Sequence, residues 1–344
     1  MSKAADLANL IGNINAGGGG ANKNVIINGD FKIKQRAGTG TQSTGLGASS
    51  GYHLHDRWSL DFNNTAGRLT MSHDSSAPSG FANSMKLACT TADTSIASDE
   101  QLRINTRIEG QNLQSFAKGT SDAKPFAVSF YVKGNASATY VCELYDNDNT
   151  RQVSKTFNVT TDWTRVELSF PADTSGAFDD DNGLSFLLQI WLHAGSNFTS
   201  GTLNTTWGSV TNANRAVGIS SFFDSTDRTF FITGVQLEVG QNPTSFEHEP
   251  FDVTLKKCHR YFFKNSSTII RSTILRPDNI RNFDIGFPTM RASATATLGY
   301  SDDGTGVSVA SQTVSADRYS GNTSASSSSN QDPRFTSFEV DAEL

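Results

Sequence analysis

The sequence predicts an all-β protein: an antiparallel, jelly-roll-type β-sandwich with a short N-terminal helix as an anchor and a small C-terminal β-domain. Three observations support this prediction. From Val25 onward, short runs of alternating apolar and polar residues are separated by Gly, Asn, Asp and Ser, a pattern typical of many short strands. Only 18% of the 344 residues are charged, which does not fit a coiled coil or a helical array. The 23 phenylalanines favour an aromatic core between sheets.

The first element, over residues 1–16, is a predicted helix. Ser2 can cap it, and its apolar stripe at helical spacing consists of Leu7, Leu10, Ile11 and Ile14. Residues 17–24 follow as a flexible Gly-rich linker. A helix of about 12 residues is marginal by itself, so the stripe needs a partner surface. Two interpretations remain open: a helix lying on its own domain, and a segment that attaches the chain to another protein, which the glycines favour.

The second element, over residues 25–250, is the sandwich. Its predicted strands are 25–33, 57–62, 68–73, 84–90, 101–108, 125–133, 138–145, 163–170, 184–192 and 229–239. Alternation assigns their faces, because successive side chains of a strand point to opposite sides. Along 184–192, Phe186 and Ile190 share an apolar face, whereas Gln189 and Trp191 share a mixed one. One apolar and one mixed face in each strand predicts two packed antiparallel sheets.

The third element, over residues 251–344, is the small C-terminal β-domain. The boundary before it carries Pro243 and Pro250 and has no periodicity. Residues 255–264 read as a short helical turn leading into a strand, and further strand-like runs surround a Ser-rich exposed loop at 320–332.

Composition excludes several classes of function. The net charge of −6 argues against a nucleic-acid partner, because phosphate contacts require clustered Lys and Arg. No apolar run approaches the roughly 18 residues of a membrane span, and the N-terminus lacks the pattern of a secretory signal, so we expect a soluble, unprocessed chain without membrane insertion. The three cysteines are too far apart for a zinc site or a dense disulfide framework: Cys89, Cys142 and Cys258.

Aromatic residues outside the apolar faces are candidates for glycan binding, because sugar recognition combines an aromatic ring with planar polar groups. The candidates are Trp191 with its neighbours Gln189 and His193, together with Trp207 and Tyr131. Two interpretations remain open for the face that carries Trp191. It is either a shallow glycan platform or an interface covered by a second layer, such as a neighbouring subunit.

Acidic turns are the candidate metal site. Asp146, Asp148, Asp179 and Asp181 lie in two runs of closely spaced oxygen ligands, which suit a structural calcium ion, although plain solvated turns explain the same pattern. No other cofactor is predicted. Carboxylates such as Glu143, Glu238 and Glu247 could pair for glycosidic acid–base chemistry, but they lie in turn-rich stretches, and no nucleophile elbow, zinc-protease motif or P-loop is present. The sequence therefore predicts a protein that is not an enzyme.

Several runs resemble the virion-associated tail proteins and tail fibres of bacteriophages, particularly marine ones. The most specific are FFITGVQLEVGQNPTSFEHEPF at 230–251 and KKCHRYF at 256–262, supported by NVIINGDFKIKQR at 24–36 and TDWTRVELSFP at 161–171. The resemblance implies a virion structural protein with a sandwich similar to carbohydrate-binding modules, usually assembled as a homotrimer. The chain departs from the longer members of this group, because only GGGGANKN stands where they carry a shaft.

The function that the sequence predicts is a structural component of a phage virion. We expect a short tail fibre or tail-associated appendage that is made in the host cytoplasm, assembles as a homo-oligomer, attaches to other virion proteins through residues 1–16 and binds host-surface polysaccharide. The alternatives are a capsid-attached head fibre or decoration protein, a polysaccharide-degrading tail-tip enzyme, and a secreted carbohydrate-binding module, which would normally need an export signal.

Overall fold

A computed structural model describes residues 3, 23–37, 40–265, 270–271, 281–301, 307–325 and 334–344. The chain divides into two compact units, Met1–Phe251 (unit 1) and Asp252–Leu344 (unit 2). The predicted attachment residues Leu7, Leu10, Ile11 and Ile14 lie outside the described residues. Among the described helices, none is long and apolar enough to cross a membrane.

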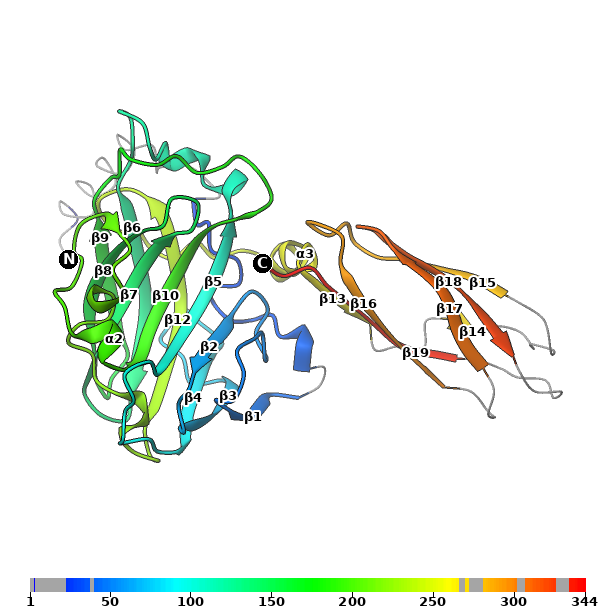
Figure 1. The fold of residues 1–344 in the computed structure, drawn as a ribbon, viewed down its shortest axis with the longest axis horizontal. Coiled ribbons are helices and arrows are strands. Elements are labelled where there is room, and N and C mark those ends of the chain that lie inside the picture. Colours follow the sequence, from blue (N-terminus) through cyan, green and yellow to red (C-terminus); the bar gives the residue numbers. More distant parts are fainter. Residues whose placement is uncertain are drawn as a thin grey trace. The chain divides into compact units, whose positions relative to one another are not determined.

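Within its described residues, unit 1 consists of two antiparallel six-stranded sheets (Figure 1). In spatial order, sheet A contains β1 (Gln42–Leu46), β3 (Arg68–Asp74), β4 (Ser84–Thr91), β12 (Thr229–Val239), β6 (Phe126–Gly134) and β9 (Thr164–Phe170). Sheet B contains β11 (Gly208–Ser209), β8 (Arg151–Val159), β7 (Ala138–Asp146), β10 (Leu184–Ala194), β5 (Gln101–Glu109) and β2 (Ser59–Asn63). The predicted all-β, antiparallel, jelly-roll-type sandwich is confirmed.

Over the described residues 23–250 of unit 1, the helices are single turns in the connections between strands. They are η1 (Gln35–Ala37), η2 (Gly110–Asn112), η3 (Gln114–Phe116), α2 (Ser196–Thr199), η4 (Asn212–Asn214) and η5 (Phe222–Asp224). The one that bears on the site is α2, because it begins the long connection after β10 that folds back over sheet B (Figure 1).

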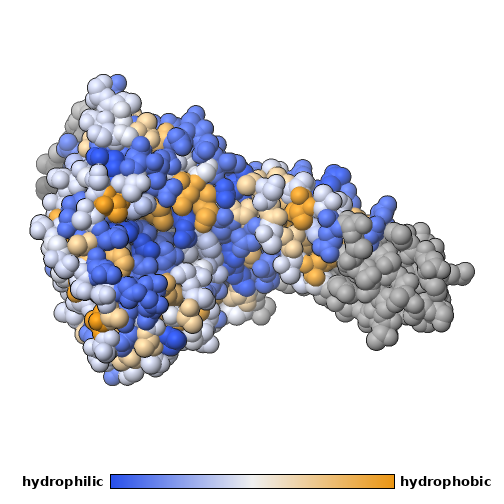
Figure 2. Space-filling model, viewed as in Figure 1, coloured by the Kyte–Doolittle hydropathy of each residue, from blue (hydrophilic) through white to orange (hydrophobic). Residues whose placement is uncertain are grey.

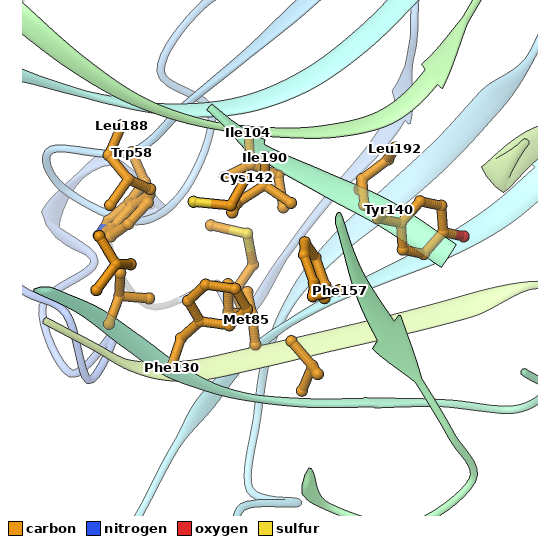
Figure 3. Packing of buried hydrophobic residues seen from close by; sticks show 14 of the residues in the cluster. Trp58, Met85, Ile104, Phe130, Tyr140, Cys142, Phe157, Leu188, Ile190 and Leu192 are labelled. Carbon is orange, nitrogen blue, oxygen red and sulfur yellow. The ribbon is translucent and has the colours of Figure 1, made fainter. Parts of the chain in front are cut away.

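The core lies between the two sheets and follows the predicted alternation. Ile104, Cys142 and Ile190 project from adjacent strands of sheet B toward Met85 and Phe130 of sheet A (Figure 3). All five side chains are fully buried. Burying a side chain of this size contributes about 1.5–3 kcal/mol, so this layer supplies the main favourable term for folding unit 1.

The predicted strand over 25–33 is wrong, because this segment packs on sheet A as irregular backbone. Asn28 and Phe31 have positive φ angles of 60° and 56°, which interrupt an extended strand. The Asn28 side chain replaces the missing ladder by donating from Nδ2 to the carbonyl oxygens of Ile33 and Asp56, each at 2.9 Å. Gly29 lies so close to Val235 of β12 that a Cβ would come within 2.1 Å of its carbonyl oxygen.

Unit 2 begins with the helix α3 (Phe251–His259), whose first residue closes unit 1, and continues as two small antiparallel sheets. One contains β13 (Phe262–Asn265), β19 (Arg334–Asp341), β14 (Ile270–Arg271) and β16 (Thr295–Ser301). The other contains β15 (Arg281–Gly286), β18 (Arg318–Ala325) and β17 (Val307–Val314). The described core of unit 2 includes Ile285, Tyr319, Phe338 and Val340.

Candidate functional site

A row of polar side chains crosses the outward side of sheet B. The cross-strand register places Glu143 beside Gln189, Gln189 beside Asn105, and Asn105 beside Ser59. These residues alternate with the core residues of the same strands, so they form one outward surface, called here the sheet-B outer face. All four are buried despite their polarity. Buried polar groups must be hydrogen-bonded, and the partners define the site.

Trp191 lies at the covered end of this face. Its indole Nε1 donates to Glu143 Oε2 at 2.7 Å, and Arg215 holds the same carboxylate with Nε–Oε1 at 2.9 Å and Nη2–Oε2 at 3.0 Å. The guanidinium carbons of Arg103 and Arg215 lie 4.9 and 5.0 Å from the centroid of the Trp191 ring. Both contacts lie within the range of a cation–π interaction.

Of the two interpretations of the face that carries Trp191, the exposed glycan platform does not hold at this residue, because the ring is fully buried. The layer that covers it is part of the same chain, the connection over residues 195–219, called here the covering loop. Ala216 packs with Trp191 and Val141, and Phe198 closes the cluster with its ring centroid 5.2 Å from Trp191.

Beyond the covering loop, the sheet-B outer face keeps an open part. Asp61 lies between two arginines, with Oδ2 at 3.2 Å from Arg103 Nη2 and Oδ1 at 3.3 Å from Arg107 Nη2. Arg107 Nη1 also donates to Tyr52 Oη at 3.2 Å. The side chains of Asp61, Arg103 and Arg107 are 16%, 13% and 17% exposed. Tyr145, on the same face, is half-buried, and the guanidinium carbon of Arg215 from the covering loop lies 5.1 Å from the centroid of its ring. Tyr52, Asp61, Arg103, Arg107 and Tyr145 define the open part.

Gln189 connects the covered end to the open part. Its Oε1 accepts from Arg103 Nη1 at 3.3 Å and from Arg215 Nη2 at 2.9 Å, and its Nε2 donates to Asn105 Oδ1 at 2.9 Å. Burial, followed by the charge of Arg215, lowers the pKa of the Arg103 guanidinium from its ordinary value. The site therefore holds two like charges close together in a partly dry environment.

His193 is also buried, so it is not the exposed glycan contact that the sequence predicted. Its Nε2 lies 3.0 Å from Glu100 Oε2, and its Nδ1 lies 2.8 Å from Ser221 Oγ. Burial lowers the pKa of His193 from its ordinary value, and the hydrogen bond and charge of Glu100 oppose that shift. The ring therefore works as a buried connection between β10 and the segments on either side.

The other two predicted glycan residues lie elsewhere. Trp207 donates from Nε1 to the carbonyl oxygen of Pro171 at 2.8 Å, and its ring packs against the core, 5.5 Å from that of Phe126. Tyr131 belongs to β6 of sheet A, where its half-buried ring lies 5.3 Å from that of Phe81. The structure thus brings Gln189, Trp191 and His193 onto one face and separates Trp207 and Tyr131 from it.

The predicted calcium site is also corrected, because its carboxylates have other partners. An ammonium group already occupies the position at Asp146: Lys118 Nζ lies 2.5 Å from Asp146 Oδ2. Asp148 Oδ2 accepts from the backbone nitrogen of Asp179, and Asp181 Oδ1 accepts from that of Gly183. Over the described ranges, no group of three or more His, Cys, Asp or Glu residues could hold a metal ion.

The sequence interpretation missed the arginines of this site. Arg103, Asn105 and Arg107 alternate with the core residues Leu102 and Ile104, so the period of two already assigned them to the outward face of β5. Arg215 had no such signal, because it lies in an irregular loop, 26 residues along the chain from the Gln189 side chain that it contacts.

No protein-family model and no curated protein matches this chain. Among solved structures, a CBM4 carbohydrate-binding module is similar at 11% identity and TM-score 0.31, covering 62% of this chain and 97% of that one. The CBM22-1 xylan-binding domain of Paenibacillus barcinonensis is similar at 10% identity and TM-score 0.30, covering 64% and 99%. The enzymatically active domain of bacteriophage CBA120 tailspike protein 4 is similar at 10% identity and TM-score 0.29, covering 63% and 21%.

Proposed function

We propose that this chain is a non-enzymatic polysaccharide-binding protein whose ligand lies on the open part of the sheet-B outer face. The observation that carries this proposal is the combination of two tyrosine rings with planar polar groups at one face: Tyr145 belongs to β7, and Tyr52, from the segment before β2, accepts from Arg107. Tyr52 and Tyr145 are half-buried, so each keeps surface for contact with the apolar side of a pyranose. Asp61, Arg103 and Arg107 supply the planar hydrogen-bonding groups that orient sugar hydroxyls.

The site is held in place before any ligand arrives. Arg107 Nη1 donates to Ser59 Oγ at 2.6 Å as well as to Tyr52, so its guanidinium is fixed from two sides. Arg103 is tied to Asp61 and Gln189. Because these side chains are already ordered, a ligand does not have to immobilise them on binding, which favours affinity.

The carboxylates of this face support binding rather than hydrolysis. Both oxygens of Asp61 accept from arginines, and both oxygens of Glu143 accept from Arg215, with Trp191 as a further donor. A glycosidase needs one carboxyl group that gives a proton to the leaving oxygen. Carboxylates that accept N–H donors on both oxygens are not arranged to do so. We expect purified protein to release no reducing ends from a polysaccharide that it binds.

Affinity electrophoresis tests the binding site, in native gels that contain one soluble polysaccharide at a time. Tyr145→Ala should weaken retardation about five- to tenfold in apparent affinity, since an aromatic contact contributes about 1 kcal/mol. Tyr131→Ala is the matched control, because Tyr131 is also half-buried but lies on sheet A. Equal retardation of both variants and the wild type would contradict this site.

We further propose that the chain acts in a phage virion, as a short tail fibre or tail-associated appendage that is homo-oligomeric and attached through residues 1–16. The resemblance of residues 230–251 and 256–262 to phage tail proteins supports this role. Deleting residues 1–16 should remove the protein from purified virions, measured by quantitative mass spectrometry. Virions that retain the shortened protein would contradict attachment through this segment, and a reconstruction that places it on the capsid would favour a head fibre.

A further inference from the structure

We propose that the open part of the sheet-B outer face selects an acidic polysaccharide, whose uronate carboxylate binds the guanidinium groups of Arg103 and Arg107. This inference rests on the proposed glycan-binding function and names the chemical class of its ligand. It follows from two independent observations, the balance of charge at the site and the kind of hydrogen-bonding group that the site leaves without a partner.

Around Asp61 and Glu143 the arginines outnumber the carboxylates, although the chain as a whole has a net charge of −6. Three arginines, Arg103, Arg107 and Arg215, share two carboxylates, Asp61 and Glu143. A surplus of cations that are partly removed from water attracts an anionic ligand.

The hydrogen bonds of the site also favour a ligand that supplies acceptors. Every acceptor at the centre of the site is already used: Asp61 Oδ1 and Oδ2 by arginines, Gln189 Oε1 by two arginines, and Asn105 Oδ1 by Gln189. At the centre of the site, two buried atoms have no partner among the described residues, Arg103 Nε and Asn105 Nδ2, and both are donors. Asn105 is fully buried. A ligand that fits this surplus of donors must bring acceptor oxygens.

Two of the other unpaired atoms, Gln152 Oε1 and Ser154 Oγ, lie on β8 under the covering loop. The backbone nitrogen of Ser154 donates to Asn204 and the Gln152 side chain donates to Thr211, so this strand belongs to the covered end of the face. These two atoms therefore belong to the covered end, whereas Arg103 Nε and Asn105 Nδ2 belong to the side chains beside Asp61 and Gln189.

A carboxylate suits this surplus because a guanidinium presents N–H donors in a planar fork that matches its two oxygens. Asp61 already takes one Nη2 contact from each of Arg103 and Arg107, and five N–H groups on each guanidinium leave donors for a second carboxylate. Tyr145, in the same cross-strand row as Arg107, can contact the sugar ring that carries the carboxylate.

The test uses the full chain and soluble polysaccharides in pairs: alginate, polygalacturonate and hyaluronate, each with its carboxyl-reduced form, together with neutral xylan and dextran sulfate. We expect at least one native acidic polymer to bind and its reduced form to bind at least about tenfold more weakly, since a hydrogen bond to a charged group is worth about 1.5–3 kcal/mol. Equal binding of the reduced form, xylan or dextran sulfate would overturn the carboxylate assignment and leave glycan binding in place. Binding to none of them would contradict the proposed function itself.

Single-residue variants test whether the acidic polysaccharide binds at this face. Arg107→Gln should lose about tenfold in affinity for the acidic polymer, and Arg107→Lys should lose less, because it keeps the charge but not the planar fork. Arg318→Gln is the matched control, since Arg318 forms an ion pair with Asp284 in unit 2, with Nη1–Oδ2 at 2.9 Å. If Arg107→Gln does not fold, the wild type still provides a test: raising NaCl from about 50 to about 500 mM should weaken binding severalfold, and salt-independent binding would overturn the inference.

Discussion

Replacing Lys118 by methionine would remove the cation from a buried charge cluster at the end of β7. The ammonium lies 2.5 Å from Asp146 Oδ2 and 3.2 Å from Asp173 Oδ2, and the side chains of Lys118 and Asp146 are fully buried. It also donates to the carbonyl oxygens of Ser175 and Gly176, at 2.8 and 2.6 Å. Methionine preserves most of the side-chain volume, so the change isolates the charge.

The expected loss is large, because removing one partner of a buried ion pair leaves the other charged and desolvated, which costs about 3–5 kcal/mol. For a domain of this size, 1 kcal/mol corresponds to about 2–4 °C in Tm, so Lys118→Met should lower the Tm of unit 1 by about 6–20 °C. Adding Asp146→Asn should restore more than half of the lost stability, since it removes the charge that was left without its cation.

Tryptophan fluorescence is the assay, because Trp58, Trp163, Trp191 and Trp207, the four tryptophans of the chain, all belong to unit 1. Lys86→Met is the control: Lys86 forms a partly exposed ion pair with Asp74 at 3.7 Å, and such pairs contribute at most about 1 kcal/mol. A Lys118→Met variant as stable as the control, or a double variant less stable than the single one, would refute the reasoning.

Three further predictions follow from the same structure. Trp191→Ala should destabilise unit 1 by about 3–5 kcal/mol in denaturant titrations, because it empties a covered pocket and removes a donor from Glu143; normal stability with lost glycan binding would contradict its buried position. His55 Nε2 lies 3.4 Å from His73 Nδ1. Burial, followed by the charge of His73, lowers the pKa of His55, and burial also lowers the pKa of His73. Folding therefore disfavours protonation of both rings, so the Tm should fall as the pH drops below about 6.5, the value for unfolded histidine, and His73→Gln should flatten that dependence. Burial opposes ionisation of Asp173, but its hydrogen bonds outweigh burial and lower its pKa, so its stabilisation should be lost as the pH falls below about 4, and less so in Asp173→Asn.

The alternation of residues predicted most of the strands of the sandwich and their inward faces, but it missed β8. In β8, Val153 and Phe157 face the core, whereas Lys155 occupies an inward position between them. The strand lies beside the two-residue edge strand β11, and the ammonium of Lys155 reaches past the core to lie 5.7 Å from the centroid of the Phe170 ring. A long side chain can bury its stem in this way and keep its charge at the rim, which hides the strand pattern.

The candidate site shows the same division between local and long-range information. The period of two assigned Gln189 and Trp191 to the outward face, and it assigns Arg103 and Arg107 to the outward face of β5, because side-chain direction along a strand is a local property. What covers that face is decided by contacts between distant residues. Arg215, from the covering loop, reaches Glu143 of β7 and buries Trp191, so the exposed ring that the sequence indicated lies under the chain's own loop.

The sequence by itself determined that the chain forms an antiparallel β-sandwich, because burial of every second side chain is encoded residue by residue along each strand. Only the tertiary structure decided which outward residues stay accessible. The face of unit 1 seen in Figure 2 is mainly hydrophilic with small separate hydrophobic patches. On the sheet-B outer face, Trp191 is buried, whereas Asp61, Arg103 and Arg107 keep part of their surface. The physical reason is that solvent exposure depends on how loops fold back over a sheet, and no periodicity within the strands specifies where an irregular loop will lie.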